Sequence, residues 1–179
     1  MPKITRDQVR VPADVMPDMR DVYITNYMKA TRETGRLMLF ACDQKIEHMN
    51  KDFYGEGIDI ADLDPEHLFK IGSQGACGVV AGQRGLIAQY ANDYPEINYL
   101  VKMNSKTNLV GTKQEDPYSP QLTDLEAVLA MRDAGVNIVG LGYTIYLGSE
   151  YEATMMAEAG ELIAQAHANG LLVVLWIYP

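Results

Sequence analysis

The sequence lacks an excess of basic residues. Its 179 residues include 15 lysines and arginines against 24 aspartates and glutamates, which gives a formal net charge of −9 at pH 7. Proteins that bind a phosphate backbone carry clustered Lys and Arg side chains, because neutralising the phosphates releases counterions. We therefore expect no nucleic acid among the partners of this protein.

Long apolar runs are also missing. No stretch approaches the roughly 20 apolar residues that are needed to span a bilayer. The N-terminal segment "MPKITRDQVRVPADVMPDMRD" has no apolar core of the kind found in a signal peptide. These absences predict a cytoplasmic protein that makes no contact with a membrane.

Cysteine and histidine are too scarce to indicate a metal or disulfide site. The two cysteines, Cys42 and Cys77, have no CxxC partner, so we expect both to be reduced and buried. Glu47 and His48 are adjacent in the sequence, but no third ligand follows at zinc spacing. The sequence predicts neither a metal nor another cofactor.

Short apolar runs alternate with helix patterns along the chain. With 47% apolar and 22% charged residues, the chain can bury a sizeable core. Five runs are typical of buried strands, in the ranges 36–43, 78–85, 97–104, 136–146 and 171–178. Helix patterns begin at the capping residues Asp64, Thr123 and Ser149 and end at Gly75, Gly135 and Gly170. This alternation predicts a parallel sheet covered by helices.

The glycine-rich turn of a dinucleotide-binding sheet is absent. Such a sheet carries G-x-G-x-x-G after its first strand, where this chain has "ACDQKIEH". The remaining parallel architecture is the closed (βα)8 TIM barrel, whose chemistry lies at the C-terminal ends of the strands. Polar and aromatic residues recur at those ends in all five predicted strands.

The length of the chain fits only part of a barrel. A complete barrel takes about 250 residues, or roughly 30 per βα unit. We therefore expect residues 36–179 to form the first five βα units of an incomplete barrel, and residues 1–35 to form an N-terminal helical extension. The chain is expected to be a portion of a longer enzyme.

Four segments resemble motifs of the archaeal-type class I fructose-bisphosphate aldolase family. "FACDQKIEH" resembles the first-strand motif, "VKMNSKTNL" the third, "VGLGYTIYLGS" the fourth and "VVLWIYP" the fifth, in the family's order and at similar spacing. The resemblance covers roughly residues 36–179. It implies a Schiff-base mechanism whose nucleophilic lysine lies on the sixth strand, which this sequence does not reach.

The resemblance implies roles for three catalytic candidates. Tyr178 would transfer protons, Asp43 would hold a substrate hydroxyl or share in proton transfer, and Trp176 would form an apolar wall that orients the substrate. Alternation along a strand places Trp176 and Tyr178 on one face. Each candidate also has a structural interpretation: Asp43 as a turn cap, Trp176 as a core ring and Tyr178 as a buried ring with a satisfied hydroxyl.

Three further residues are predicted to bind substrate: Lys102, Tyr146 and His48. Lys102 stands on the third strand, where the family has an equivalent lysine. We expect it to lower the pKa of a neighbouring lysine or to hold a substrate oxygen, and not to form the Schiff base itself.

The predicted function is the reversible cleavage of fructose 1,6-bisphosphate into dihydroxyacetone phosphate and glyceraldehyde 3-phosphate, in glycolysis or gluconeogenesis. One alternative is a related sugar-phosphate aldolase or transaldolase of an aromatic-precursor pathway. Another is a non-catalytic fragment that only assembles with other subunits. The partners expected are a sugar-phosphate substrate and further copies of the chain in a homo-oligomer, because apolar edge strands favour pairing.

Overall fold

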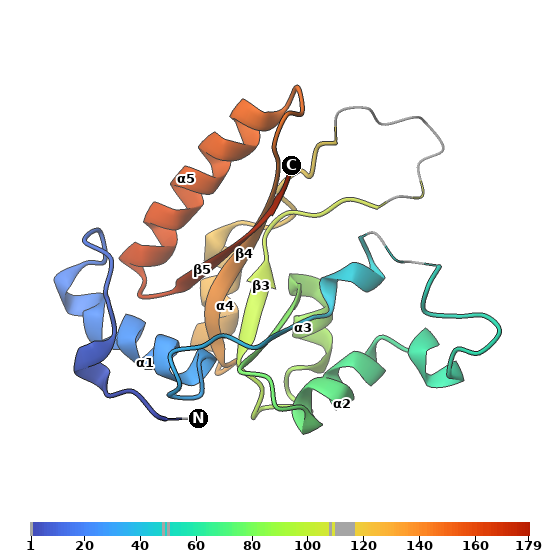
Figure 1. The fold of residues 1–179 in the computed structure, drawn as a ribbon, viewed down its shortest axis with the longest axis horizontal. Coiled ribbons are helices and arrows are strands. Elements are labelled where there is room, and N and C mark those ends of the chain that lie inside the picture. The colour runs from blue at the N-terminus through green and yellow to red at the C-terminus, as the bar shows by residue number, and fades with distance from the viewer. Residues whose placement is uncertain (1, 48, 50, 108, 110–116) are drawn as a thin grey trace.

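Five parallel strands form a single curled sheet. The computed structural model describes residues 2–47, 49, 51–107, 109 and 117–179. The strands are β1 (Leu39–Ala41), β2 (Val79–Gln83), β3 (Tyr99–Lys102), β4 (Ile138–Tyr146) and β5 (Leu172–Tyr178). They lie side by side in chain order, without the reversal that marks a doubly wound sheet (Figure 1). This order confirms the prediction of a partial TIM barrel with five strands.

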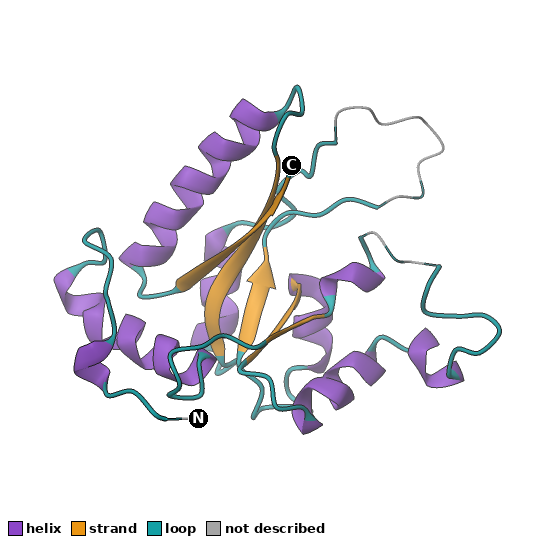
Figure 2. Cartoon of the chain, viewed as in Figure 1, coloured by secondary structure: helices purple, strands orange, loops and turns teal. Residues whose placement is uncertain are grey.

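Helices cover the outer face of this sheet and its lower end (Figure 2). The α-helices are α1 (Arg20–Ala30), α2 (Glu66–Gln74), α3 (Arg84–Tyr90), α4 (Leu125–Asp133) and α5 (Glu152–Ala168). Four short 3-10 helices are η1 (Arg6–Gln8), η2 (Pro17–Met19), η3 (Asp43–Lys45) and η4 (Ile60–Leu63). Helix α3 was not predicted, because it follows β2 directly and its N-cap residue, Gln83, makes no capping hydrogen bond with its side chain.

Side-chain hydrogen bonds lie near the start of three helices, but only in α4 does the N-cap residue itself make one; the N-cap residues of α2 and α5 are Pro65 and Tyr151, so the caps predicted at Asp64 and Ser149 were wrong by one and two residues. The Asp64 carboxylate accepts a hydrogen bond from the backbone N–H of Glu66 at 3.0 Å, and α2 ends before Gly75. Helix α4 is capped by Asp124, which accepts from the backbone N–H of Ala127 at 2.8 Å, so the predicted cap at Thr123 was wrong by one residue. Ser149 accepts from the backbone N–H of Tyr151 at 3.0 Å, just before α5.

The two faces of the sheet carry different layers of apolar side chains. The larger layer lies between the strands and the outer helices, where Phe69 of α2 packs against Tyr90 and Tyr99 at ring distances of 5.0 and 6.1 Å. A smaller layer lines the inner face of the sheet and comprises Ala30, Val79, Ala81, Leu100 and Val139, with Leu39, Leu172, Val174 and Trp176 at its margin. The inner layer separates the bottom of the half-barrel from its polar upper end.

Helix α1 closes the N-terminal end of the strands. A Cβ atom at Gly78 would lie 1.7 Å from the carbonyl oxygen of Ala30, so only glycine permits this approach. On the other side, the amide of Asn26 donates to the carbonyl of Gly170 at 2.8 Å. The boundary predicted between residues 35 and 36 falls in the loop between α1 and β1, and it stays a prediction.

The two cysteines differ in exposure. Cys42 is buried, and burial raises the pKa of its thiol. Cys77 is only partly buried, so the expectation that both thiols are buried was wrong for this residue. Both are free thiols. Within the described part of the chain, none of the helices combines the length and apolar character needed to cross a membrane.

Candidate active site

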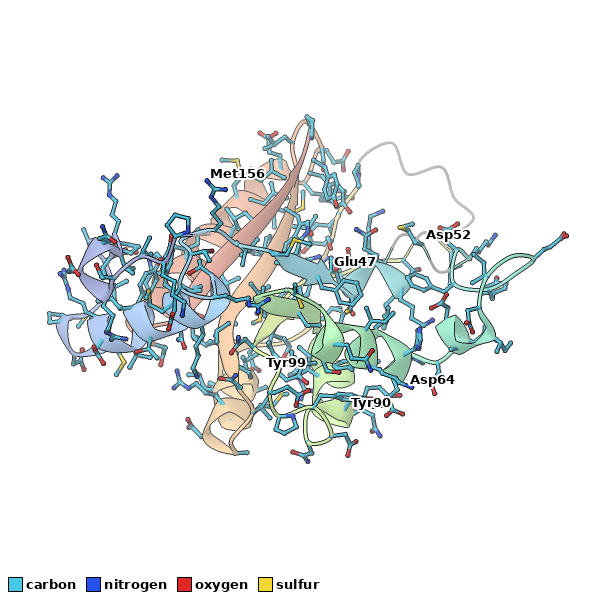
Figure 3. All side chains as sticks on the ribbon, turned by 60° about the horizontal axis from the view of Figure 1, so that its bottom comes forward. Glu47, Asp52, Asp64, Tyr90, Tyr99 and Met156 are labelled. Atoms are coloured by element: carbon cyan, nitrogen blue, oxygen red, sulfur yellow. The ribbon has the colours of Figure 1, made fainter. Side chains whose placement is uncertain are left out.

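A tight turn after β1 carries two buried carboxylates. Asp43 begins the 3-10 helix η3, and the backbone N–H of Glu47 donates to the carbonyl of Asp43 at 3.1 Å. This single turn brings the two side chains together, with relative exposures of only 3% for Asp43 and 1% for Glu47. Figure 3 shows Glu47 well apart from Tyr90 and Tyr99, which belong to the outer layer.

Both carboxylates bind one lysine. Lys102 is the last residue of β3 and is 1% exposed. Its ammonium donates to Asp43 Oδ2 at 2.9 Å and to Glu47 Oε1 at 2.7 Å. These are charge-assisted hydrogen bonds, which are about twice as strong as neutral ones. The three side chains, called here the carboxylate–lysine cluster, carry one positive and two negative charges.

Trp176 of β5 covers this cluster. The Lys102 ammonium lies 4.9 Å from the centroid of the indole ring, within the range of a cation–π contact. Gly142, which is paired with Lys102 in the sheet, makes room for the ring, because a Cβ atom there would lie 2.5 Å from it. A glycine inside a strand often marks such a close approach.

Amides fix the strand ends around the cluster. The Gln83 side chain donates to the carbonyl of Asp43 at 3.2 Å and to the Ser105 hydroxyl at 3.3 Å. The Asn104 side chain donates to the carbonyl of Thr144 at 2.9 Å and accepts from the backbone N–H of Thr144 at 2.8 Å. These bonds tie the C-terminal ends of β2, β3 and β4 to one another, which preorganises the site.

Two stacked tyrosines stand at the ends of β4 and β5. Tyr146 and Tyr178 are paired in the sheet, and their rings stack with centroids 5.5 Å apart. Tyr178 is 37% exposed, whereas Tyr146 is buried. Burial raises the pKa of Tyr146, and the negative charges of Glu47 and Asp43 raise it further. Its hydroxyl therefore remains a neutral hydrogen-bond donor at physiological pH.

Several buried polar atoms of this region lack a hydrogen-bond partner in the structure. Four of them belong to residues at the C-terminal ends of β1, β2 and β4: Asp43 Oδ1, Gln83 Oε1, Thr144 Oγ1 and Tyr146 OH. Buried polar groups in proteins are normally paired, so such a concentration calls for an explanation. A ligand rich in hydroxyl groups would satisfy both the acceptors and the donors.

The structure brings together most of the residues that the sequence analysis selected. Lys102 contacts both Asp43 and Trp176, and Tyr146 stacks on Tyr178. His48 lies outside the described residues. The roles assigned to all six residues stay predictions.

Glu47 was missed as a site residue. The sequence analysis considered it only as half of a metal-binding pair with His48. Its position four residues after Asp43 was the available signal, but its partner comes from a strand 55 residues further along the chain. In the described part of the chain, His, Cys, Asp and Glu side chains do not form a group of three or more that could hold a metal ion.

Comparison with known proteins gives consistent matches. The profile of the DeoC/LacD family aldolases matches residues 37–179. The fructose-bisphosphate aldolase/6-deoxy-5-ketofructose 1-phosphate synthase of Methanocaldococcus jannaschii is 49% identical over 178 residues, which are 99% of this chain and 57% of the relative. The chain therefore spans little more than half the length of this relative.

Solved structures agree in fold. The fructose-bisphosphate aldolase from Slackia heliotrinireducens is 80% identical with a TM-score of 0.96, and the match covers 99% of this chain and 56% of that one. A Schiff-base-forming fructose-1,6-bisphosphate aldolase matches at 24% identity with a TM-score of 0.69, over 86% of this chain and 56% of that one.

Proposed function

The chain belongs to the DeoC/LacD aldolase family, and from this premise we propose that it supplies the first five βα units of a class I aldolase acting on fructose 1,6-bisphosphate. The observation that carries the proposal is the carboxylate–lysine cluster under Trp176, at the end of the strands where TIM-barrel enzymes place their chemistry. The relatives from Methanocaldococcus and Slackia, at 49% and 80% identity, bear the name of this activity.

The proposed reaction needs a nucleophilic lysine and a base. The lysine amine attacks the ketose carbonyl, and loss of water gives an iminium ion. The bond between C3 and C4 then breaks. Its electron pair moves toward the iminium to form an enamine, while the C4 hydroxyl loses its proton to the base and the C4–C6 half leaves as glyceraldehyde 3-phosphate. Protonation of the enamine carbon and hydrolysis release dihydroxyacetone phosphate and free the lysine.

Lys102 is poorly suited to be the nucleophile. Imine formation requires an unprotonated amine that is free to attack, whereas the Lys102 nitrogen binds two carboxylates in a buried position. In the proposal, the nucleophilic lysine comes from a segment outside this chain. Of the two roles predicted for Lys102, the holding of a substrate oxygen stays in the proposal, because the two bound carboxylates offset the positive charge that would favour the neutral form of a second amine.

The remaining site residues take roles that follow from their positions. Tyr178 lies at the open end of β5 and transfers protons. The unpartnered oxygen of Asp43 accepts a hydrogen bond from a substrate hydroxyl. The neutral Tyr146 hydroxyl donates a hydrogen bond to a substrate oxygen. Trp176 forms the wall that orients the substrate. His48 is retained as a predicted substrate-binding residue.

The proposal includes a cellular setting. The reaction would serve glycolysis or gluconeogenesis in the cytoplasm, and the protein would be a homo-oligomer. The edge strands β1 and β5 of the described sheet are open to pairing with further strands, which the remaining units of a barrel would supply.

A second activity is suggested by one relative. The Methanocaldococcus protein is also named a 6-deoxy-5-ketofructose 1-phosphate synthase. A site built to break a carbon–carbon bond through an enamine can also form one with another aldehyde. We therefore propose the condensation of a related sugar phosphate as the alternative function.

The experiment uses a completed barrel, made by fusing this chain to the segment that follows the matched region in the Slackia aldolase. We expect it to release dihydroxyacetone phosphate from fructose 1,6-bisphosphate and to keep this activity in EDTA, because the Schiff base replaces a metal ion as electron sink. A coupled dehydrogenase assay with several ketose phosphates measures the preference. A folded barrel that cleaves none of them would contradict the proposal, and a clear preference for another ketose would favour the alternative.

A further inference from the structure

We propose that Glu47 is a positioning residue, which holds the Lys102 ammonium in place so that one oxygen of Asp43 stays open to the substrate. The inference rests on the proposed function for the nature of that substrate. It concerns a residue that would not touch the substrate itself but would act through Lys102.

In the cluster, each of the two carboxylates accepts one hydrogen bond from the Lys102 ammonium. Lys102 lies 2.7 Å from Glu47 Oε1 and 2.9 Å from Asp43 Oδ2. The other oxygen of Asp43, Oδ1, is buried and has no hydrogen-bond partner in the structure. Asp43 therefore binds the lysine with Oδ2, and Oδ1 is left available to a substrate. Glu47 accepts a second hydrogen bond from the ammonium and so keeps it on the Oδ2 side of Asp43.

Removal of the Glu47 charge would change the position of the Lys102 ammonium relative to the two oxygens of Asp43. Asp43 would become the only anion bound to the Lys102 ammonium, and attraction would draw the ammonium across both of its oxygens. The indole ring of Trp176, 4.9 Å from the ammonium, limits movement on another side of the lysine. Oδ1 would then be occupied when the substrate arrives.

Stability alone does not account for a second buried carboxylate. A single Asp–Lys pair would already balance the charge of the lysine, yet a second carboxylate binds the same ammonium in a site where all three side chains are at most 4% exposed. Burying a charge is costly, and replacing buried ion pairs by apolar residues is often neutral or stabilising. The additional carboxylate therefore points to a functional constraint.

The test compares Glu47→Gln with Glu56→Gln in the completed barrel. The glutamine side chain keeps the size and a hydrogen-bond acceptor but removes the charge, and Glu56 is an exposed residue that provides the matched loss of one charge. We expect Glu47→Gln to lower kcat/KM by about 10- to 100-fold, the range of one hydrogen bond to a charged group. The loss should appear mainly in KM, because a ground-state contact is lost. Borohydride trapping at saturating substrate should be unchanged.

A conservative variant separates positioning from packing. Glu47→Asp keeps the charge and should recover part of the lost kcat/KM. A purely structural role predicts a lower melting temperature for Glu47→Gln with KM unchanged, and that result would overturn the inference. So would equal kcat/KM values for the Glu47→Gln and Glu56→Gln variants.

A double-mutant cycle tests the same coupling without activity. With Lys102 present, Glu47→Gln should lower the melting temperature. In a Lys102→Met background, Glu47→Gln should raise the melting temperature, because it removes one of two buried carboxylates that no longer share the Lys102 ammonium. The same sign in both backgrounds would contradict the inference. A completed barrel without aldolase activity would refute the proposed function. The effect of Glu47→Gln on the melting temperature in the two backgrounds would still test the coupling between Glu47 and Lys102.

Discussion

Tyr178→Phe should reduce the turnover of the completed barrel by about 10²- to 10⁴-fold, the usual contribution of a general acid or base. Only a hydroxyl is lost, and the phenylalanine ring can still stack on Tyr146, so the fold should be retained. Attack by the lysine precedes the step assigned to Tyr178. Borohydride trapping of the imine should therefore remain at the wild-type level while steady-state cleavage falls.

The structural alternative predicts a different pattern. If Tyr178 only packs, with its hydroxyl in an ordinary hydrogen bond, the variant should lose about 1 kcal/mol of stability and almost no turnover. Tyr54→Phe is a suitable control, because Tyr54 is 53% exposed and lies in the loop between η3 and η4. Cleavage rate and melting temperature measured on the same samples distinguish the two interpretations. Full activity in Tyr178→Phe would disprove the proposed role.

Lys102→Met should destabilise the protein by about 3–5 kcal/mol, the usual loss when one partner of a buried ion pair is removed. Methionine approximates the length of the lysine stem, so little packing is lost. The large term is electrostatic, because Asp43 and Glu47 both lose the lysine that they bind, at relative side-chain exposures of 4% and 2%. Urea denaturation of wild type and variant measures the difference in the free energy of unfolding.

An exposed lysine gives the matched control for this variant. Lys70→Met removes the same charge from the surface of α2 and should change stability by less than about 0.5 kcal/mol. A Lys102→Met variant that is as stable as the Lys70→Met variant would show that the buried carboxylates do not depend on the lysine. Such a result would also remove the basis for the role of Glu47.

The fold and part of the site could be predicted because they depend on local patterns. Apolar runs separated by capped helices specify a parallel sheet, and the polar residues that end those runs must then meet at one edge. The resemblance to the aldolase motifs then selected Asp43, Lys102 and Trp176 among these strand-end residues. Helix α3 was not predicted, since it begins at Arg84 immediately after β2 and carries no side-chain cap that the sequence could reveal.

The remaining features depend on contacts between distant segments. Glu47 can be identified as a site residue only through its hydrogen bond from Lys102. The stack of Tyr146 on Tyr178 depends on the register of β4 against β5. Gly142 is a similar case, because its lack of a side chain matters only when the ring of Trp176 is placed beside it. Periodicity and capping signals do not encode such pairings.

The location of the Schiff base tests the central claim most directly. The completed barrel is incubated with fructose 1,6-bisphosphate, reduced with borohydride and digested, and the modified lysine is identified by mass spectrometry. We predict a single adduct on a lysine of the segment joined after Pro179 and none on Lys102, whose nitrogen is bound by Asp43 and Glu47. An adduct on Lys102, or efficient cleavage without any trapped lysine, would contradict the account.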